Sequence, residues 1–211
     1  MVDSKKVCKI YIVRHGESQA NANKIVQGHT DSPLTEKGEA QSVKIAEELK
    51  DVEFSAIFSS DLGRSIRTAE IIGFRRNLEI KTSPMLREKS YGIFEGMDHA
   101  EFIETLKEEF NRFDNELTIE ERWNHKAHPS IESDTEILGR FTGYVKEIIS
   151  RHGGETVLVV SHRFPIRMFL VSLGYGMYEN LKRGSLKNAG YAVLESNGQT
   201  FSVDEVFGQE T

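Results

Sequence analysis

The sequence predicts a three-layer α/β/α fold with a mostly parallel central sheet. Strand-like and helix-like segments alternate along the chain, which is the order of a parallel sheet covered by helices on both faces. The runs from Val7 to Val13 and from Thr156 to Ser161 are almost wholly apolar, as expected of strands buried on both sides. The pair Asn197-Gly198 separates two last strand-like runs and predicts a terminal hairpin that adds an antiparallel edge strand.

Length and composition predict a single domain over residues 1–211. The chain has 211 residues, of which 38% are hydrophobic and 28% charged, enough apolar material for one core.

Its net charge of −6 argues against a general nucleic-acid or anionic-membrane binder. The one cysteine, Cys8, excludes an internal disulfide. We see no targeting or membrane-spanning segment, and we therefore expect a cytoplasmic protein.

The remaining elements follow from local patterns. Thr35 is a suitable N-cap, and the sequence Ser133-Asp134-Thr135-Glu136 is a capping box, so each predicts a helix start. Pro165 fits the first turn of a helix that ends near Gly174. Together these signals predict strands at 7–13, 54–59, 78–82, 156–161, 189–195 and 200–207, and helices at 35–50, 61–72, 133–152 and 163–174.

The segment 97–132 departs from this alternation. It is acidic and carries Phe102, Leu106, Phe110 and Phe113 at helical spacing, followed by an irregular tail. We predict one helix there. Because the segment has no place in the alternating pattern, we interpret it as a helical insertion that forms a lid over one end of the sheet and over the active site.

Polar residues follow three of the predicted strands. Arg14-His15 ends the first, Ser60 to Arg64 follows the second, and Ser161-His162-Arg163 ends the strand at 156–161. Ligands of open α/β sheets bind beyond the carboxyl ends of the strands. The sequence therefore predicts a binding site built from these three strand ends.

The tripeptide Arg-His-Gly occurs twice, in different settings. Arg14-His15-Gly16 follows a buried strand and precedes a predicted helix. A helix N-terminus, an arginine fork and a glycine together favour an anion site. Arg151-His152-Gly153 instead ends a helix, where the cations complement the helix terminus and the glycine supplies a left-handed cap. We expect function at the first copy only.

Other chemistries lack their motifs. The sequence contains no G-x-x-x-x-G-K-[ST], G-x-G-x-x-G or G-x-S-x-G pattern. His125 and His128 have no second ligand cluster, so we expect no metal site. Cys8 and Arg14 have the spacing of a cysteine phosphatase loop, but the residues between them form an apolar strand without glycine. We expect Cys8 to be a small buried hydrophobe.

Four blocks of the sequence resemble the histidine phosphatase (phosphoglycerate mutase-like) superfamily, branch 1. They occur in the family's order over nearly the whole chain. The blocks are Arg14-His15-Gly16-Glu17-Ser18 with Asn21, Gln27-Gly28, Asp31, Pro33-Leu34-Thr35 and Gly38; Ser59 to Ala69; Leu86-Arg87-Glu88 with Tyr91-Gly92 and Glu95-Gly96; and Val160-Ser161-His162 with Ile166-Arg167.

The resemblance implies a role for each matching residue. His15 would be the nucleophile that becomes phosphorylated, and Glu88 the general acid and base. The residues themselves leave Glu17 and Glu95 as equally plausible carboxylates, and only the resemblance selects Glu88. The implied groups around the transferring phosphoryl group are Arg14, Asn21, Gln27, Gly28, Arg64 and His162.

One position departs from the family pattern. The family usually has glycine after its second histidine, and this chain has Arg163. The side chain would either crowd the pocket or add a fourth cation for a more negatively charged substrate. We favour the added cation and place Arg163 among the substrate-binding residues.

We therefore expect a phosphomonoester hydrolase that acts through a phosphohistidine intermediate on a small phosphorylated metabolite, with no metal and no cofactor. A cofactor-dependent phosphoglycerate mutase is the first alternative, although the chain lacks the longer insertion with paired arginines that such mutases use. A non-catalytic family member that binds a phospho-ligand or a protein is the second. The sequence predicts neither a nucleic-acid nor a membrane partner, and it leaves the substrate and the oligomeric state open.

Overall fold

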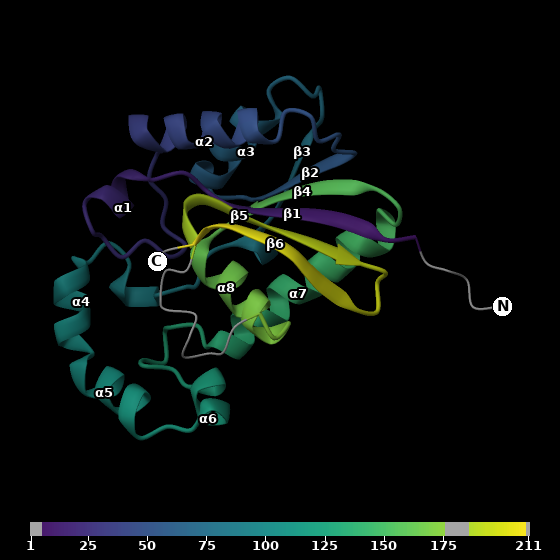
Figure 1. Cartoon of the computed structure of the whole chain (residues 1–211). Helices are drawn as coiled ribbons and strands as arrows, with labels where there is room; N and C mark the ends of the chain where they lie inside the picture. The colour runs from purple at the N-terminus through teal and green to yellow at the C-terminus, as the bar shows by residue number, and fades with distance from the viewer. Residues whose placement is uncertain (1–5, 176–185, 210–211) are drawn as a thin grey trace.

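A six-stranded sheet forms the centre of the protein (Figure 1). The computed structural model describes residues 6–175 and 186–209. The sheet order is β3-β2-β4-β1-β5-β6. The strands are β1 (Cys8–Arg14), β2 (Ala56–Ser60), β3 (Ile80–Ser83), β4 (Thr156–Ser161), β5 (Leu186–Ser196) and β6 (Phe201–Gln209).

The strand directions confirm the predicted fold class. Strands β1 to β4 pair in parallel, whereas β5 pairs antiparallel with β1 and β6 antiparallel with β5. The terminal hairpin therefore contributes two strands. The strand that runs against the other five is β5, which lies next to the edge, and β6 is the edge itself.

Helices cover both faces of the sheet (Figure 1). One face carries α2 (Glu36–Glu48) and α3 (Gly63–Gly73), and the other carries α7 (Asp134–Arg151) and α8 (Arg163–Ser172). Ile12 and Val13 of β1 point to opposite faces, and both are fully buried in separate core clusters. In the parts of the chain that the structure describes, no helix is long and apolar enough to cross a membrane.

Helix α7 follows the capping box that the sequence contains. The Ser133 hydroxyl accepts a hydrogen bond from the backbone N–H of Glu136, and the Glu136 carboxylate accepts from the N–H of Ser133. The C-terminal end of α7 differs from the prediction that Gly153 supplies a left-handed cap. The residue with a left-handed backbone is Gly154, at φ 86°.

The segment 97–132 forms three short helices, so the prediction of one helix is wrong. They are α4 (His99–Thr105), α5 (Lys107–Asn115) and α6 (Ile119–Asn124). The chain leaves helical geometry at Leu106, with φ −107° and ψ 19°, where Leu106 packs into a small cluster with Phe94 and Phe102. The three helices lie beyond the end of the sheet at which β1 finishes (Figure 1). That they form a lid stays a prediction.

Three single turns complete the described structure. Helix α1 (Gln19–Ala22) follows β1, and the 3₁₀ turns Pro84–Leu86 and Gly92–Phe94 lie between β3 and α4. The helix expected after Arg14-His15-Gly16 is present, but α1 has only four residues and begins after the N-cap Ser18. One turn carries little of the dipole that a longer helix would aim at an anion.

Two glycines allow α2 to contact the segment that follows β1. A Cβ on Gly38 would lie 2.0 Å from the carbonyl oxygen of Glu17, and one on Gly16 would lie 2.3 Å from the carbonyl oxygen of Gly38. Both atoms are backbone, so neither can move without moving the chain. This close approach fixes the loop directly after His15.

We expect Gly38→Ala to lower the free energy of unfolding by about 1–3 kcal/mol, because the methyl group overpacks this contact. Gly139 is a matched control, since it also lies in a helix but has open space around its Cβ position. Gly139→Ala should leave the stability unchanged or raise it by up to about 1 kcal/mol, the usual helix preference for alanine. Urea unfolding of both variants measures the difference, and equal effects would contradict this account of the contact.

Candidate active site

The carboxyl ends of β1, β2 and β4 meet, as the sequence predicted, because these strands are neighbours in the sheet. Arg14 at the end of β1 is in register with Ser161 at the end of β4. The next residues, His15 and His162, therefore lie side by side, with ring centroids 4.9 Å apart. Both imidazoles are buried, at 3% and 0% exposure.

His15 is held as a neutral ring with a defined tautomer. Its Nδ1 lies 2.7 Å from the carbonyl oxygen of Gly16. A carbonyl only accepts hydrogen bonds, so Nδ1 carries the proton and Nε2 keeps its lone pair. Burial lowers the pKa of His15 well below its ordinary value, and the positive charges of Arg64 and Arg14 lower it further.

His162 lies beside His15 but is not itself among the residues that line the cavity. Its Nε2 lies 2.8 Å from the hydroxyl of Ser60 and 3.1 Å from that of Ser65. Its Nδ1 is buried and has no hydrogen-bond partner among the residues that the structure describes. Burial, followed by the charge of Arg64, holds the pKa of His162 well below its usual range. If the serine hydroxyls donate to Nε2, the neutral ring carries its proton on Nδ1.

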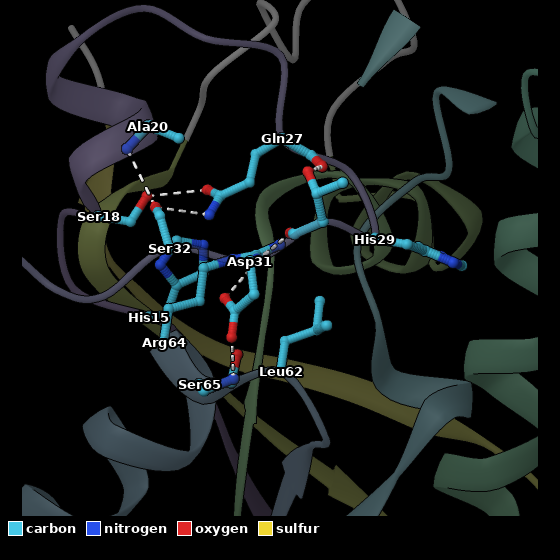
Figure 2. A network of polar contacts seen from close by, with 12 residues as sticks. His15, Ser18, Ala20, Gln27, His29, Asp31, Ser32, Leu62, Arg64 and Ser65 are labelled. Atoms are coloured by element: carbon cyan, nitrogen blue, oxygen red, sulfur yellow. Dashed lines mark hydrogen bonds and ion pairs between the residues drawn. The ribbon is translucent and has the colours of Figure 1, made fainter. Parts of the chain in front are cut away.

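Arg64 is the most deeply buried cation of the site, at 1% exposure. Its Nη1 donates to the carbonyl of Thr30 and to the carboxylate of Asp31, both at 2.9 Å, and its Nη2 donates to the carbonyl of Gly28 at 2.8 Å. Figure 2 shows Asp31 beside this guanidinium. Arg14 is also buried, and its Nη1 donates to the carbonyl of Leu186. Two positive charges thus lie beside the two neutral imidazoles.

A small polar network shapes the loop between α1 and α2 (Figure 2). The Gln27 side chain accepts from the Ser18 hydroxyl at 2.8 Å and donates to the Ser32 hydroxyl at 2.9 Å. Asn21 Oδ1 accepts from the side-chain amide of Asn188 at 3.1 Å. Asn21, Gln27 and Gly28 all border the site cavity, but the Gln27 amide is engaged in holding its own loop.

The first turn of α8 faces the site and holds a carboxylate. Glu88 Oε1 accepts from the backbone N–H groups of Lys89 at 2.8 Å and Phe164 at 3.1 Å. No hydrogen bond joins its Oε2 to any described residue. The Glu88 carbonyl accepts from Arg140 Nη2 at 2.8 Å, so the backbone is held as well as the side chain.

Geometry separates the three candidate carboxylates. Glu88 borders the cavity, whereas Glu17 and Glu95 lie outside its lining. The Glu17 carboxylate pairs with Lys37 at 2.7 Å. Glu95 accepts from backbone N–H groups, including those of His29 and Tyr91, and so supports the surrounding loops. Of the three, only Glu88 borders the cavity, and its role as general acid and base stays a prediction.

The cavity has a volume of about 800 Å³ and two different ends. Its base contains His15, Arg14, Arg64 and Glu88, and its outer part extends under α4 and α5. Arg163 also borders it, and the Arg163 Nε is buried without a hydrogen-bond partner among the described residues. The sequence analysis had placed Arg163 among the substrate-binding residues.

Several positioning residues carried no role in the sequence analysis. Ser60 and Asp31 both lie in blocks that resemble the family, and Ser60 also follows a predicted strand. The sequence therefore contained signals that could have identified them as part of the site. Asn188 donates to the carbonyl of His15 at 3.3 Å, and Arg140 acts on the carbonyl of a residue 52 positions away. Neither Asn188 nor Arg140 lies in a sequence pattern that would have identified it as part of the site.

The rejected motifs lie elsewhere or form no site. His128 Nδ1 lies 2.8 Å from the Ser130 hydroxyl. Within residues 6–175 and 186–209, no group of three or more His, Cys, Asp or Glu side chains could hold a metal ion. Cys8 is fully buried in β1, and burial raises the pKa of its thiol to about 11, so the nucleophilic thiolate does not form near neutral pH.

We expect the His15 ring to be neutral, with its proton on Nδ1, at about pH 6, where an ordinary histidine of pKa about 6.5 is mostly protonated. The reason is that burial and two neighbouring cations lower its pKa, so the ring loses its second proton at a lower pH. Nitrogen NMR in phosphate-free buffer distinguishes the states, and His15→Ala assigns the signal. Adding inorganic phosphate should raise the pKa. A doubly protonated His15 in the free protein at this pH would refute the assignment.

Comparison with known proteins agrees with this geometry. A model of the histidine phosphatase superfamily (branch 1) matches residues 10–207. A probable phosphoglycerate mutase GpmB from Cronobacter sakazakii is 37% identical over 162 residues, which are 73% of this chain and 69% of that protein. Phosphoserine phosphatase 1 from Hydrogenobacter thermophilus is 34% identical over 188 residues, covering 88% of this chain and 85% of that protein.

The solved structure of Bacillus stearothermophilus YhfR superimposes on the fold with a TM-score of 0.83 and 30% sequence identity, covering 97% of this chain and 98% of that one. The superfamily model spans all the strand ends that form the site. The chain therefore belongs to the histidine phosphatase superfamily (branch 1).

Proposed function

We propose that the chain hydrolyses phosphate monoesters through a covalent phosphohistidine on His15. The observation that carries this proposal is the pairing of a neutral His15, whose Nε2 keeps its lone pair, with the buried cations Arg14 and Arg64 and with His162. Phosphoryl transfer needs in-line placement and charge stabilisation more than any other help.

In the first step, His15 Nε2 forms a bond to phosphorus as the bond from phosphorus to the ester oxygen breaks. The protonated carboxyl group of Glu88 gives its proton to the departing oxygen, and an alcohol leaves. Arg14, Arg64 and the Nδ1–H of His162 stabilise the phosphoryl oxygens. We place Arg163 beside these cations, and Asn21, Gln27 and Gly28 at the edge of the phosphoryl site.

In the second step, the Glu88 carboxylate takes a proton from water. The water oxygen attacks phosphorus, the bond from phosphorus to His15 Nε2 breaks, and inorganic phosphate leaves. His15 and the Glu88 acid are restored. Neither step uses a metal or a cofactor, and the substrate is a small phosphorylated molecule.

The cavity favours hydrolysis over mutase chemistry. A mutase that acts on phosphoglycerate must bind a second acidic group and keep water away from phosphohistidine. In the described outer part of the cavity, Lys89 is already paired with Asp134 at 3.1 Å, and Arg122 donates to the carbonyls of Leu117 and Asp114. Assaying 3-phosphoglycerate with and without bisphosphoglycerate distinguishes the two, since stimulation by the bisphosphate marks a mutase.

We expect His15→Ala to lower the hydrolysis of p-nitrophenyl phosphate by more than about 10³-fold, because the nucleophile is lost. The second Arg-His-Gly copy supplies a matched control, since His152→Ala changes the same tripeptide at the end of α7 and should keep the wild-type rate. Turnover of labelled substrate quenched in alkaline detergent should show a base-stable, acid-labile phosphoprotein in wild type and His152→Ala but not in His15→Ala. Equal rates for wild type and His15→Ala would exclude catalysis at this site and favour a non-catalytic, ligand-binding protein.

The loss of kcat caused by Glu88→Gln should depend on the leaving group of the ester. General acid catalysis is worth about 10²–10⁴-fold for an alkyl phosphate, whose alkoxide needs a proton. p-Nitrophenolate leaves readily without one, so the loss with p-nitrophenyl phosphate should be much smaller. The measurement is kcat for both esters. Equal losses would show that Glu88 does not protonate the departing oxygen.

A further inference from the structure

We propose that the alcohol part of the substrate is bulky, apolar and uncharged, such as an aromatic or long-chain alcohol, and that it lies in the outer part of the cavity. This inference rests on the proposed hydrolysis. The outer chamber, as we call this part, is lined by Tyr91, Phe102, Ile103, Phe110, Phe113, Ala127, Ile131 and Phe164. Most of this lining comes from the segment 97–132, outside the blocks shared with the family.

The wall of the outer chamber is preformed. Phe102 is 5% exposed and packs edge-on against Tyr91 at 5.5 Å and against Phe110 at 5.6 Å, measured between ring centroids. Tyr91 in turn contacts Phe164 at 6.3 Å. Rings fixed by one another present a surface that does not need to be ordered when a ligand binds, which favours affinity for an apolar group.

Packing within the protein does not use the whole apolar surface of the insertion. Phe102 and Leu106 are buried in the small cluster with Phe94, as core residues are. Ile103 keeps 36% of its surface exposed and borders the cavity. Phe113 is half-buried, borders the cavity and packs against His125, with ring centroids 5.7 Å apart. Both side chains thus form part of the wall that a ligand would contact.

Lys89 and Arg122, two cations that border the outer chamber, already have partners. Lys89 and Asp134 form an ion pair at 3.1 Å with side chains only 15% and 6% exposed. The Arg122 guanidinium donates to backbone carbonyls and lies over the Phe113 ring, 5.3 Å from its centroid. His125 also borders the chamber, and burial lowers its pKa, so it is neutral near neutral pH. We place Arg163, whose Nε has no partner among the described residues, at the phosphoryl site. A second acidic group in the outer chamber would therefore have to displace one of these pairings.

Volume supports the same conclusion. A cavity of about 800 Å³ lies in the upper part of the range that encloses drug-sized ligands, roughly 300–1,000 Å³. A three-carbon phosphorylated acid would fill the base and leave the apolar chamber to water. An aromatic or long-chain group instead removes both its own surface and the chamber wall from water.

The first experiment compares matched esters. Phenyl phosphate and 2-naphthyl phosphate have leaving groups of similar acidity and differ in apolar size, whereas octyl phosphate and 3-phosphoglycerate are both alkyl esters and differ in charge. We expect kcat/KM to be at least about tenfold higher for 2-naphthyl than for phenyl phosphate, and for octyl phosphate than for 3-phosphoglycerate, which is the discrimination that a fitted apolar pocket gives. Equal values within both pairs, or a preference for 3-phosphoglycerate, would overturn the inference.

The second experiment assigns the preference to the chamber. Phe113→Ala should reduce the ratio of kcat/KM for 2-naphthyl to phenyl phosphate towards one. Ile103→Ser, at a more exposed position, should reduce the same ratio and serves if Phe113→Ala folds poorly. Phe74→Ala is the control, since Phe74 is 87% exposed and lies outside the cavity, and it should keep the wild-type ratio. Because each ratio comes from one preparation, the fraction of active protein cancels.

The outcomes separate this inference from the proposed function. Hydrolysis of p-nitrophenyl phosphate that depends on His15, without any preference for apolar esters, would overturn only the substrate class. No hydrolysis of any ester would overturn the proposed function and this inference together. An apolar preference that Phe113→Ala and Ile103→Ser both leave intact would refute the assignment to the outer chamber.

Discussion

The site depends on a guanidinium that is buried almost completely. Arg64 has 1% exposure, and burying a charge is costly unless it is paired and hydrogen-bonded. Its two Nη atoms are bonded, whereas its Nε has no partner among the described residues. Its partners are the carbonyls of Gly28 and Thr30 and the carboxylate of Asp31, all in the loop before α2. One interaction therefore fixes that loop against α3, supplies the positive charge beside His15, and contributes to keeping the two imidazoles neutral.

The two parts of the cavity come from different parts of the chain. The polar base comes from residues at or soon after strand ends, where a parallel sheet brings distant segments together whatever lies between them. Most of the apolar chamber comes from the segment 97–132, which the sheet does not constrain. A fold of this kind can therefore keep one phosphoryl-transfer centre while insertions change the molecules that reach it, as is general for sites carried on common folds.

Local signals in the sequence were sufficient for the sheet, for most helix starts and for the meeting of His15 with His162. The capping box at Ser133 and the apolar run of β1 each depend on neighbouring residues only. The break at Leu106 was not predictable in this way, because the burial of Leu106 against Phe94 decides it. The length of α1 and the left-handed residue at Gly154 likewise depend on packing that periodicity does not report.

The selection of Glu88 illustrates the same limit. Chemistry alone offered three carboxylates, and the resemblance to a family was needed to select one. In the structure, contacts from α8 and from Arg140, both far along the chain, hold Glu88 at the cavity. Glu95 has the same chemical group but accepts from nearby backbone N–H groups instead. Which carboxylate reaches the cavity therefore depends on contacts in the folded structure rather than on the residue type.

The pairing of β5 with β1 has a consequence for synthesis on the ribosome. The backbone N–H of Ala189 donates to the carbonyl of His15, and the carbonyl of Leu186 accepts from Arg14. A growing chain that has exposed every residue up to β4 still lacks these restraints on His15 and Arg14. The proposed nucleophile thus acquires its alignment only after β5 has emerged, so translation products that stop before β5 would have the motif without its alignment.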